Sequence, residues 1–298
     1  MYFIYVINDI TNAVKSSTIY LFADDTTLLI NTKEPQDLEK IAFIELNNIL
    51  QWLTENNFTI NSNKSKLIKF SIKNKLKSTT TNIQLQDEEI YNEPEVNFLG
   101  LRMDENLKFE THIHNVCKKI SSGIFVLRNL SKFCSKDVLL TVYYSLIVPH
   151  LKYAVIIWGR QKTKNVFILQ KKALRVVFKL KQRDSCRKVF KDQKILTFAS
   201  IYILETIMFA RKNFKSFNQR HHLKSYHDLR EIDVFKVFTH NTMFLEKQAT
   251  YSGIILSNKL PSSLKKYFFS ENFVTLLRNY LLNQSYYTVE DYLFDIHI

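Results

Sequence analysis

The chain has 298 residues, a length that accommodates one or two domains with a sizeable hydrophobic core. Its 42 Lys and Arg residues against 28 Asp and Glu residues give a net charge of +14, which indicates either a polyanionic partner or simply a basic protein. Four unclustered glycines exclude a P-loop or dinucleotide fingerprint, and three widely spaced cysteines exclude a disulfide framework.

The first predicted elements are an apolar N-terminal segment and a β-hairpin. Residues 1–10 begin directly in an apolar run without a polar cap, so we expect the chain to lack part of its first domain. The segments 18–23 and 26–30 are rich in β-forming residues and predict two strands. Asp24 and Asp25 lie between them as a two-residue turn, which would place both carboxylates at the hairpin tip.

Further along the chain, the hydrophobic pattern changes from mixed to purely helical. A core-facing helix is predicted after Pro35 and Asp37, and short strands are predicted at 67–72 and 96–102, the second with Gly100 as a bulge or a close backbone approach. The clearest later helices are predicted over residues 112–130, 135–148, 164–180, 191–212 and 273–282. This order predicts an α+β region followed by an all-α region.

The two adjacent acids of the hairpin are a candidate metal site. Neighbouring carboxylates repel each other and are best ionised beside a cation, and Mg²⁺ is the usual cation where the flanking residues carry no soft ligands. An isolated Asp-Asp pair is most often a solvated turn. Here the order Phe22-Ala23-Asp24-Asp25, with a strand on each side, is much more specific.

The segment Phe22-Ala23-Asp24-Asp25 resembles the palm signature of reverse transcriptases, the RNA-directed DNA polymerases. Together with residues 5–10, it resembles more narrowly the polymerases of jockey-like non-long-terminal-repeat retrotransposons. No single motif is decisive, but the segments that resemble this family follow its order over nearly the whole chain. The further segments are 46–52 with 57–70, 96–104, 143–159, 169–175 and Leu260-Pro261.

This resemblance implies a partial polymerase palm over residues 1–106, an all-α thumb over 107–215 and a mainly helical C-terminal region over 216–298. The implied reaction is template-directed DNA synthesis from deoxynucleotides on an RNA template and a DNA primer. Two Mg²⁺ ions, with Mn²⁺ as the alternative, would stabilise the attacking and leaving oxygens. Asp24 matches the family's metal ligand, and Asp25 matches the neighbour that supports the site.

The family takes a further metal-binding aspartate from an earlier palm strand, which we do not find in this sequence. The acid that precedes the hairpin, Asp9, matches a structural Asn-Asp pair at a helix end and reads as a cap or turn residue. Because positioning supplies most of the catalysis in phosphoryl transfer, we expect this chain alone to be inactive. The missing strand would also expose a hydrophobic sheet edge, which predicts poor solubility or self-association through the hairpin.

Three further sets of residues match functional positions of this family. Lys64 matches a general acid toward the pyrophosphate leaving group, with an exposed turn lysine as the alternative. Phe98, Leu99 and Gly100 match the primer-grip strand, with ordinary strand core as the alternative. Residues 162–194 carry a net charge of +10, on a surface that either contacts phosphates or is simply a solvated helix face. The candidate nucleic-acid contacts in this segment are Lys164, Lys171, Lys172, Arg175 and Lys179.

Three functional hypotheses stay open: part of an active polymerase, a nucleic-acid-binding remnant without catalysis, and a decayed element copy without selected function. The coding DNA upstream of Met1 would separate them, because an in-frame strand with an Asp there would indicate a live enzyme. The sequence contains no apolar run of about 18 residues, so we expect no membrane partner. Without a signal peptide or disulfide pattern, an intracellular ribonucleoprotein of the cytoplasm and nucleus is expected.

Overall fold

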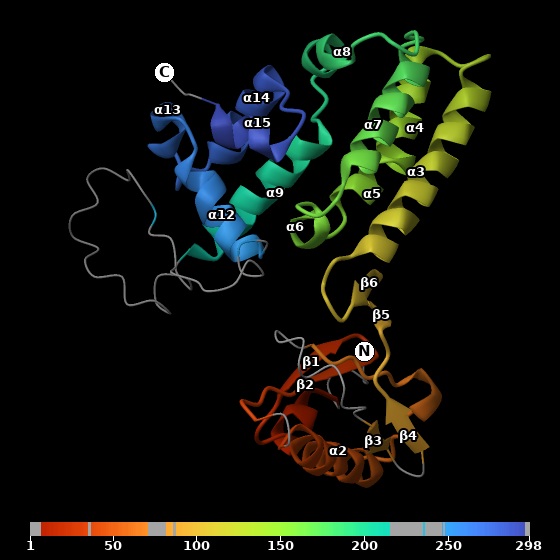
Figure 1. Ribbon diagram of the computed structural model, residues 1–298, viewed down its shortest axis with the longest axis vertical. Coiled ribbons are helices and arrows are strands. Elements are labelled where there is room, and N and C mark those ends of the chain that lie inside the picture. The colour runs from red at the N-terminus through yellow and green to blue at the C-terminus, as the bar shows by residue number, and fades with distance from the viewer. Residues whose placement is uncertain are drawn as a thin grey trace. The chain divides into compact units, whose positions relative to one another are not determined.

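The computed structural model describes residues 7–34, 37–70, 82–85, 88–214, 235, 246 and 248–295 (Figure 1). The chain forms two compact units, residues 1–107 and 108–298. In the described residues, the first unit combines helices with small antiparallel strand pairs, and the second is helical throughout. The predicted α+β class is therefore confirmed. The predicted boundary after residue 215 lies outside the described residues.

The first unit is a series of short elements around one longer helix. In chain order they are η1 (Asn8–Ala13), β1 (Thr18–Phe22), β2 (Asp25–Leu29), α2 (Asp37–Glu55), η2 (Ser62–Lys64), β3 (Asn82–Leu85), β4 (Glu88–Tyr91), β5 (Glu95–Phe98) and β6 (Leu101–Asp104). β1 pairs with β2, β3 with β4 and β5 with β6, each pair antiparallel.

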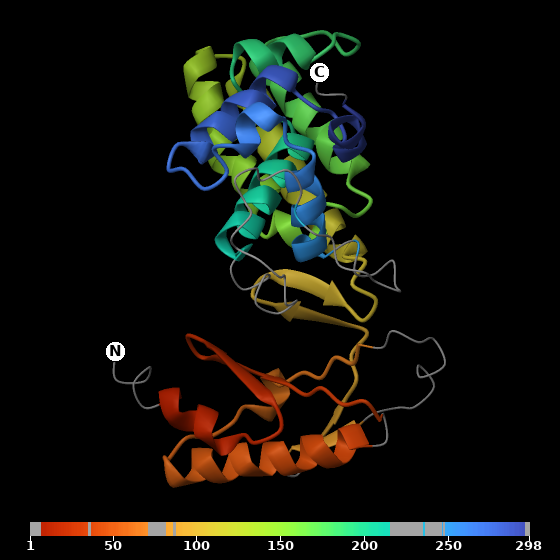
Figure 2. The same ribbon diagram turned by 90° about the vertical axis from the view of Figure 1, so that its left-hand side faces the viewer.

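The core that positions the acidic hairpin lies between η1, the β1–β2 pair and α2, which confirms the helix predicted after Asp37. Ile7, Ile10 and Ile49 are buried there. Successive side chains of a strand point to opposite faces, so one face of the hairpin supplies the apolar contacts to this core. The partly buried residues around the core include Ile19, Leu21, Leu28, Trp52 and Leu53. Figure 2 shows the hairpin lying over α2.

The hairpin turn lies one residue earlier than predicted. Phe22 pairs with Asp25 across the hairpin, so Ala23 and Asp24 are the two turn residues and Asp25 is the first residue of β2. The sequence pattern did not reveal this shift, because Asp is a common turn residue at either position. Only Asp24 therefore stands in the turn itself.

Two other strand predictions are also corrected. Within the described part of the predicted strand 67–72, Leu67 forms an isolated parallel bridge to Asn92, and residues 68–70 are irregular. The predicted single strand at 96–102 is instead the β5–β6 hairpin, in which Gly100 is a turn residue and not a bulge. Val96 on β5 and Leu101 on β6 are its buried side chains.

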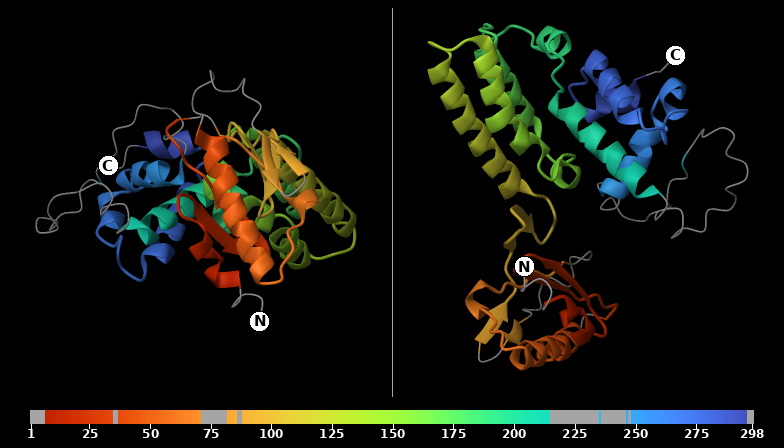
Figure 3. Two further views of the ribbon diagram at one scale, coloured as in Figure 1. Left: turned by 90° about the horizontal axis from the view of Figure 1, so that it is seen from below. Right: turned by 180° about the vertical axis from the view of Figure 1, so that it is seen from behind.

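The second unit is built from helices that pack on one another. In chain order they are α3 (Glu110–Leu130), α4 (Lys136–Leu146), α5 (Val148–Lys152), α6 (Val155–Trp158), α7 (Lys164–Val177), α8 (Arg187–Asp192), α9 (Phe198–Lys212), α12 (Ala249–Asn258), α13 (Ser262–Lys265), α14 (Phe273–Gln284) and α15 (Val289–Phe294). Figure 3 shows α3 beside α7, and α9 with the later helices packed along it. α9 also contacts the earlier helices α5, α6 and α7.

α9 is the central helix of the second unit. Ten of its 15 residues are buried, so it is apolar on nearly every side and must be enclosed by other helices. The buried side chain of Gln170 on α7 links the start of α9 to α4 through hydrogen bonds. The Gln170 side chain donates to the Tyr143 hydroxyl and the Leu196 carbonyl, and it accepts from the Phe198 N–H.

Two helix predictions need correction at their ends. The predicted helix 164–180 ends at Val177, before Lys179, which adopts a left-handed conformation. The predicted helix 191–212 is divided into α8 and α9, because Lys194 is also left-handed and the Thr197 side chain caps the new helix by accepting from a backbone N–H. Within the described part of the chain, no helix combines the length and apolar character needed to cross a bilayer.

Candidate functional site

The acidic hairpin presents its carboxylates to solvent. Asp24 and Asp25 are both exposed, one in the turn and one at the start of β2. The residue before them, Ala23, has φ 53°, a left-handed conformation that favours glycine at the first position of such hairpin turns. Backbone strain of this kind persists where the surrounding structure imposes it, and it is common at functional sites.

The two faces of the hairpin differ in what covers them. The inward face packs on the core of the first unit, whereas Tyr20 is 55% exposed and Phe22 is 65% exposed on the outward face, with the half-exposed Leu29 beside them. Among the described residues, β1 and β2 pair only with each other. Unpaired strand edges can pair with a strand of another chain, and an exposed apolar face can bind another protein surface.

The hairpin can supply hard oxygen ligands, which is the donor chemistry that Mg²⁺ and Mn²⁺ prefer. In the part of the chain that the structure describes, no group of three or more His, Cys, Asp or Glu residues comes together as a metal site. The described residues thus add no third ligand of these types to the carboxylates of Asp24 and Asp25. The two carboxylates fall short of the ligand set that two ions require.

Glu45 is a buried acid that the sequence analysis missed. It lies on the inward face of α2, where only 1% of the residue is exposed, and its carboxylate binds the residues just ahead of β1. Burial by itself raises the pKa of Glu45, but the N–H groups of Ser16 and Lys15 and the Ser17 hydroxyl stabilise the charged form. The net pKa therefore lies below the ordinary 4.5. The sequence does contain one sign of this buried acid. Glu45 lies seven residues after Leu38, and therefore on the same, otherwise apolar, face of the helix.

Lys64 is exposed and ends the short helix η2. The side chain of Asn61 caps this helix by accepting from the Lys64 backbone N–H. The other lysine of this segment, Lys66, forms an ion pair of 2.9 Å with Glu93. Of these two lysines, Lys64 is thus the exposed one without an ion pair among the described residues.

The predicted primer-grip residues lie at the tip of the β5–β6 hairpin. Leu99 and Gly100 form its two-residue turn, and both have positive φ values, 46° and 82°. That backbone normally requires Asn or Gly, so a leucine there is strained. Both residues are exposed, whereas Phe98 is half-buried at the end of β5. The tip therefore presents backbone and an apolar side chain to solvent.

The basic residues of α7 do not all face solvent. The ammonium group of Lys171 lies 4.6 Å from the ring centroid of Phe167 and 5.4 Å from that of Tyr287. Arg175 donates a hydrogen bond of 3.1 Å to the backbone carbonyl of Asp184. These two cations are partly used within the protein. The candidate residues that are exposed are Lys164, Lys172 and Lys179.

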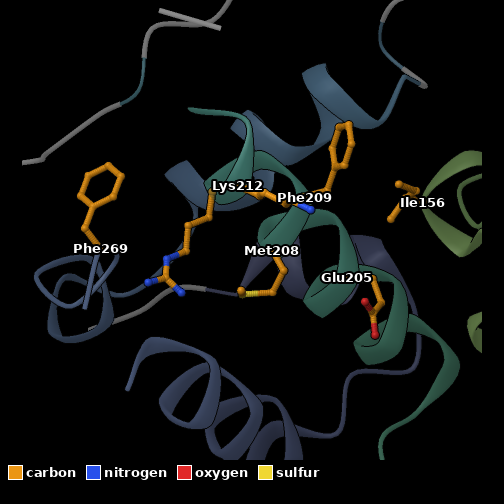
Figure 4. Close-up of a pocket in the computed structure, with 7 residues that line it drawn as sticks. Ile156, Glu205, Met208, Phe209, Lys212 and Phe269 are labelled. Atoms are coloured by element: carbon orange, nitrogen blue, oxygen red, sulfur yellow. The ribbon is translucent and has the colours of Figure 1, made fainter. Parts of the chain in front are cut away.

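The second unit also has an open groove of about 550 Å³ along α9 (Figure 4). Two of its three charged lining groups are engaged, and the third, Lys212, is exposed. Glu205 forms an ion pair of 3.1 Å with Lys152, and Arg211 donates to the Ser270 carbonyl at 2.7 Å. Among its charged lining residues, only Lys212 is therefore left for a ligand, and one exposed lysine is not a converging set of polar groups. Its lining residues are Ile156, Glu205, Met208, Phe209, Arg211, Lys212 and Phe269.

Comparison with known proteins places a family match on the first unit. Residues 1–103 match the family model described as reverse transcriptase (RNA-dependent DNA polymerase). The chain is also similar to a probable RNA-directed DNA polymerase from transposon X-element of Drosophila melanogaster, with 24% identity over 172 residues. That match covers 54% of this chain and 18% of the Drosophila protein. No solved structure matches the chain significantly.

Proposed function

We propose that this chain is part of an RNA-directed DNA polymerase of a jockey-like non-long-terminal-repeat retrotransposon. The observation that carries the proposal is the acidic hairpin, with exposed Asp24 in its turn, inside the region that matches the reverse transcriptase family. In this proposal, residues 1–106 are part of the palm, 107–215 are the thumb and 216–298 are the C-terminal region. The substrates are an RNA template, a DNA primer and deoxynucleotides.

Each proposed role comes from the family resemblance and is compatible with the exposure of the residue. Asp24 and Asp25 would hold the divalent ion, Mg²⁺ or Mn²⁺, which when bound stabilises the attacking and leaving oxygens of nucleotidyl transfer. Lys64, exposed at the end of η2, donates a proton to the departing pyrophosphate. The tip formed by Leu99 and Gly100, next to Phe98, supports the primer end through its backbone.

The all-helical unit would hold the nucleic acid. The exposed Lys164, Lys172 and Lys179 contact the phosphate backbone, and Lys171 and Arg175 contribute charge from their partly engaged positions. This surface also favours the second candidate function, a nucleic-acid-binding remnant without catalysis. In either case, affinity for nucleic acid should fall linearly with salt on logarithmic axes.

We further propose that the isolated chain does not extend primers. Among the described residues, the hairpin carboxylates converge with no third potential metal ligand, so two ions would be under-coordinated.

The outward face with Tyr20 and Phe22 would favour self-association, which sedimentation velocity of the wild-type chain and of Tyr20→Glu can test. A dimer or larger species that becomes a monomer in the variant is the expected result.

Iron-directed cleavage tests the proposed metal site without requiring activity. Fe²⁺ replaces Mg²⁺, and added peroxide then cuts the backbone near the bound ion. Cleavage centred on Asp24, competed by Mg²⁺ and lost in Asp24→Asn, is the expected pattern. Asp37→Asn, an exposed acid at the start of α2, serves as the matched control and should cleave like the wild type. A hairpin left uncut, or cut equally in Asp24→Asn, would overturn the metal assignment.

A further inference from the structure

Glu45 occupies a position that an apolar residue would be expected to fill. It lies on the buried face of α2 between Ala42 and Ile49, and all three residues are buried. A carboxylate in such a place is unfavourable unless its oxygen atoms are hydrogen-bonded. The contacts it makes therefore indicate why an acid stands there.

The partners of the Glu45 carboxylate are three consecutive residues. The backbone N–H of Ser16 donates to Oε1 at 2.6 Å. The backbone N–H of Lys15 donates to both oxygens, at 3.0 Å and 3.2 Å, and the Ser17 hydroxyl donates to Oε2 at 3.0 Å. Hydrogen bonds to a charged acceptor are stronger than those between neutral groups, so this is a firm anchor.

The anchored residues immediately precede the acidic hairpin. β1 begins at Thr18, directly after Ser17, and runs to Phe22, so one strand separates the anchor from Asp24. On the inward face of the same hairpin, side chains pack on the core beside Ile49 of α2. The start of β1 is thus attached to α2 by polar contacts, and its middle is attached by apolar contacts.

We propose that Glu45 is a positioning residue for the acidic hairpin. By binding the three residues ahead of β1, it fixes where the strand starts relative to α2 and thereby holds Asp24 and Asp25 in place. This inference rests on the proposed function, in which a polymerase needs its metal-binding carboxylates at a fixed position. Glu45 itself touches no substrate and acts through the hairpin.

Hydrogen exchange of the full chain, followed by mass spectrometry, tests the proposal. In Glu45→Ala, the amides of residues 15–29 should lose protection by roughly tenfold or more, because two backbone N–H groups lose a charged acceptor. Amides of the α2 interior and of β5–β6 in the same unit should keep theirs. Glu45→Gln retains one acceptor oxygen and should restore part of the protection. Glu55→Gln, an exposed acid on the same helix, is the matched control.

The distribution of the exchange effect decides the outcome. An equal loss in α2 and in β5–β6 would show that Glu45 merely stabilises the whole unit, and unchanged protection of residues 15–29 would show that it does not hold the hairpin. Either result overturns the proposal. A failure of the proposed function is seen separately, as the absence of iron-directed cleavage at Asp24 in the wild-type chain. Where the wild type is cut there, Glu45→Ala should spread or abolish that cut.

Discussion

The longest helix described in the first unit, α2, and the central helix of the second unit, α9, are buried to very different degrees. In α2, three of 19 residues are buried, and one of these is the acid Glu45. In α9, ten of 15 residues are buried. Since burial of apolar surface is the main favourable term in folding, the helical unit has the stronger core. The first unit instead depends on a small apolar cluster and on polar anchors such as Glu45.

Strain and exposed apolar side chains occur in both units, but in the first they gather on the hairpins. Ala23 and Leu99 are left-handed at the tips of β1–β2 and β5–β6, and Tyr20 and Phe22 of β1 are exposed. Such features cost stability, and they are found where a surface must meet something else. The helical unit therefore has the larger core, and the first unit exposes two apolar side chains beside its acidic turn.

The largest predicted effect lies in the helical core. Trp158 is fully buried, contacts His112 and Phe198, and donates to the Tyr153 carbonyl. Trp158→Ala should destabilise the second unit by about 3–5 kcal/mol, because it leaves a cavity in a packed core. Hydrogen exchange should show this loss in the second unit alone.

The matched control is Phe133→Ala, since Phe133 is 75% exposed and its removal should change stability by no more than about 0.5 kcal/mol. Equal destabilisation of both units by Trp158→Ala would contradict the view that they hold separate cores.

Acid should affect the two units at different pH values. Burial, aided by the positive charge of Lys119, lowers the pKa of His112 and of His150 below the ordinary 6.5. The unfolded chain then binds protons more readily, so the second unit should lose stability as pH falls below about 6.5. The lowered pKa of Glu45 likewise makes the folded state less stable in acid. Its contribution to the stability of the first unit is complete above about pH 4.5 and is lost only below that pH.

Chemical denaturation at pH 7.5, 5.5 and 4, monitored by hydrogen exchange of each unit, would measure these changes. We expect the helical unit to weaken between pH 7.5 and 5.5 and the Glu45 anchor to weaken only near pH 4. The reverse order would contradict both pKa assignments. His112→Gln should remove part of the first change and leave the second unaffected.

The smallest predicted effect concerns the hairpin turn. Ala23→Gly should stabilise the β1–β2 pair by about 1 kcal/mol, because glycine adopts positive φ without strain. Exchange of the paired amides of residues 18–29 measures this change. Ala42→Gly, inside α2, should have the opposite sign, since glycine is a poor helix former. Faster exchange in Ala23→Gly would show that the turn is not strained.

The sequence predicted the elements whose hydrophobic period is long and regular. The α2 helix and the α3 helix follow from periodicity. The hairpin of 18–23 with 26–30 follows from β-forming residues around a turn, although the turn lies one residue earlier than predicted. The predicted helix at 273–282 is likewise confirmed by α14. These elements were predictable because one face of each is buried, and burial of one face gives the sequence a regular hydrophobic period.

The sequence predictions were wrong where the backbone adopts a left-handed conformation that the hydrophobic pattern does not reveal. Leu99 in a left-handed turn does not resemble a turn residue, so the β5–β6 hairpin was predicted as one strand. Lys194 similarly divides a predicted helix. Glu45 was missed because a single acid on an apolar stripe indicates a special role only when its partners are known. The roles of Asp24 and Lys64 came from family resemblance and stay predictions.

The central claim is that nucleic acid meets the protein at the acidic hairpin and not only at the basic helices. A primer with a photo-reactive 3′-terminal nucleotide, annealed to an RNA template, tests it directly in the presence of Mg²⁺. Our account predicts crosslinks from the primer end to the β1–β2 turn near Asp24 and to the tip at Leu99 and Gly100. Crosslinks confined to residues 162–194 would contradict it and would leave a nucleic-acid-binding module without a polymerase site.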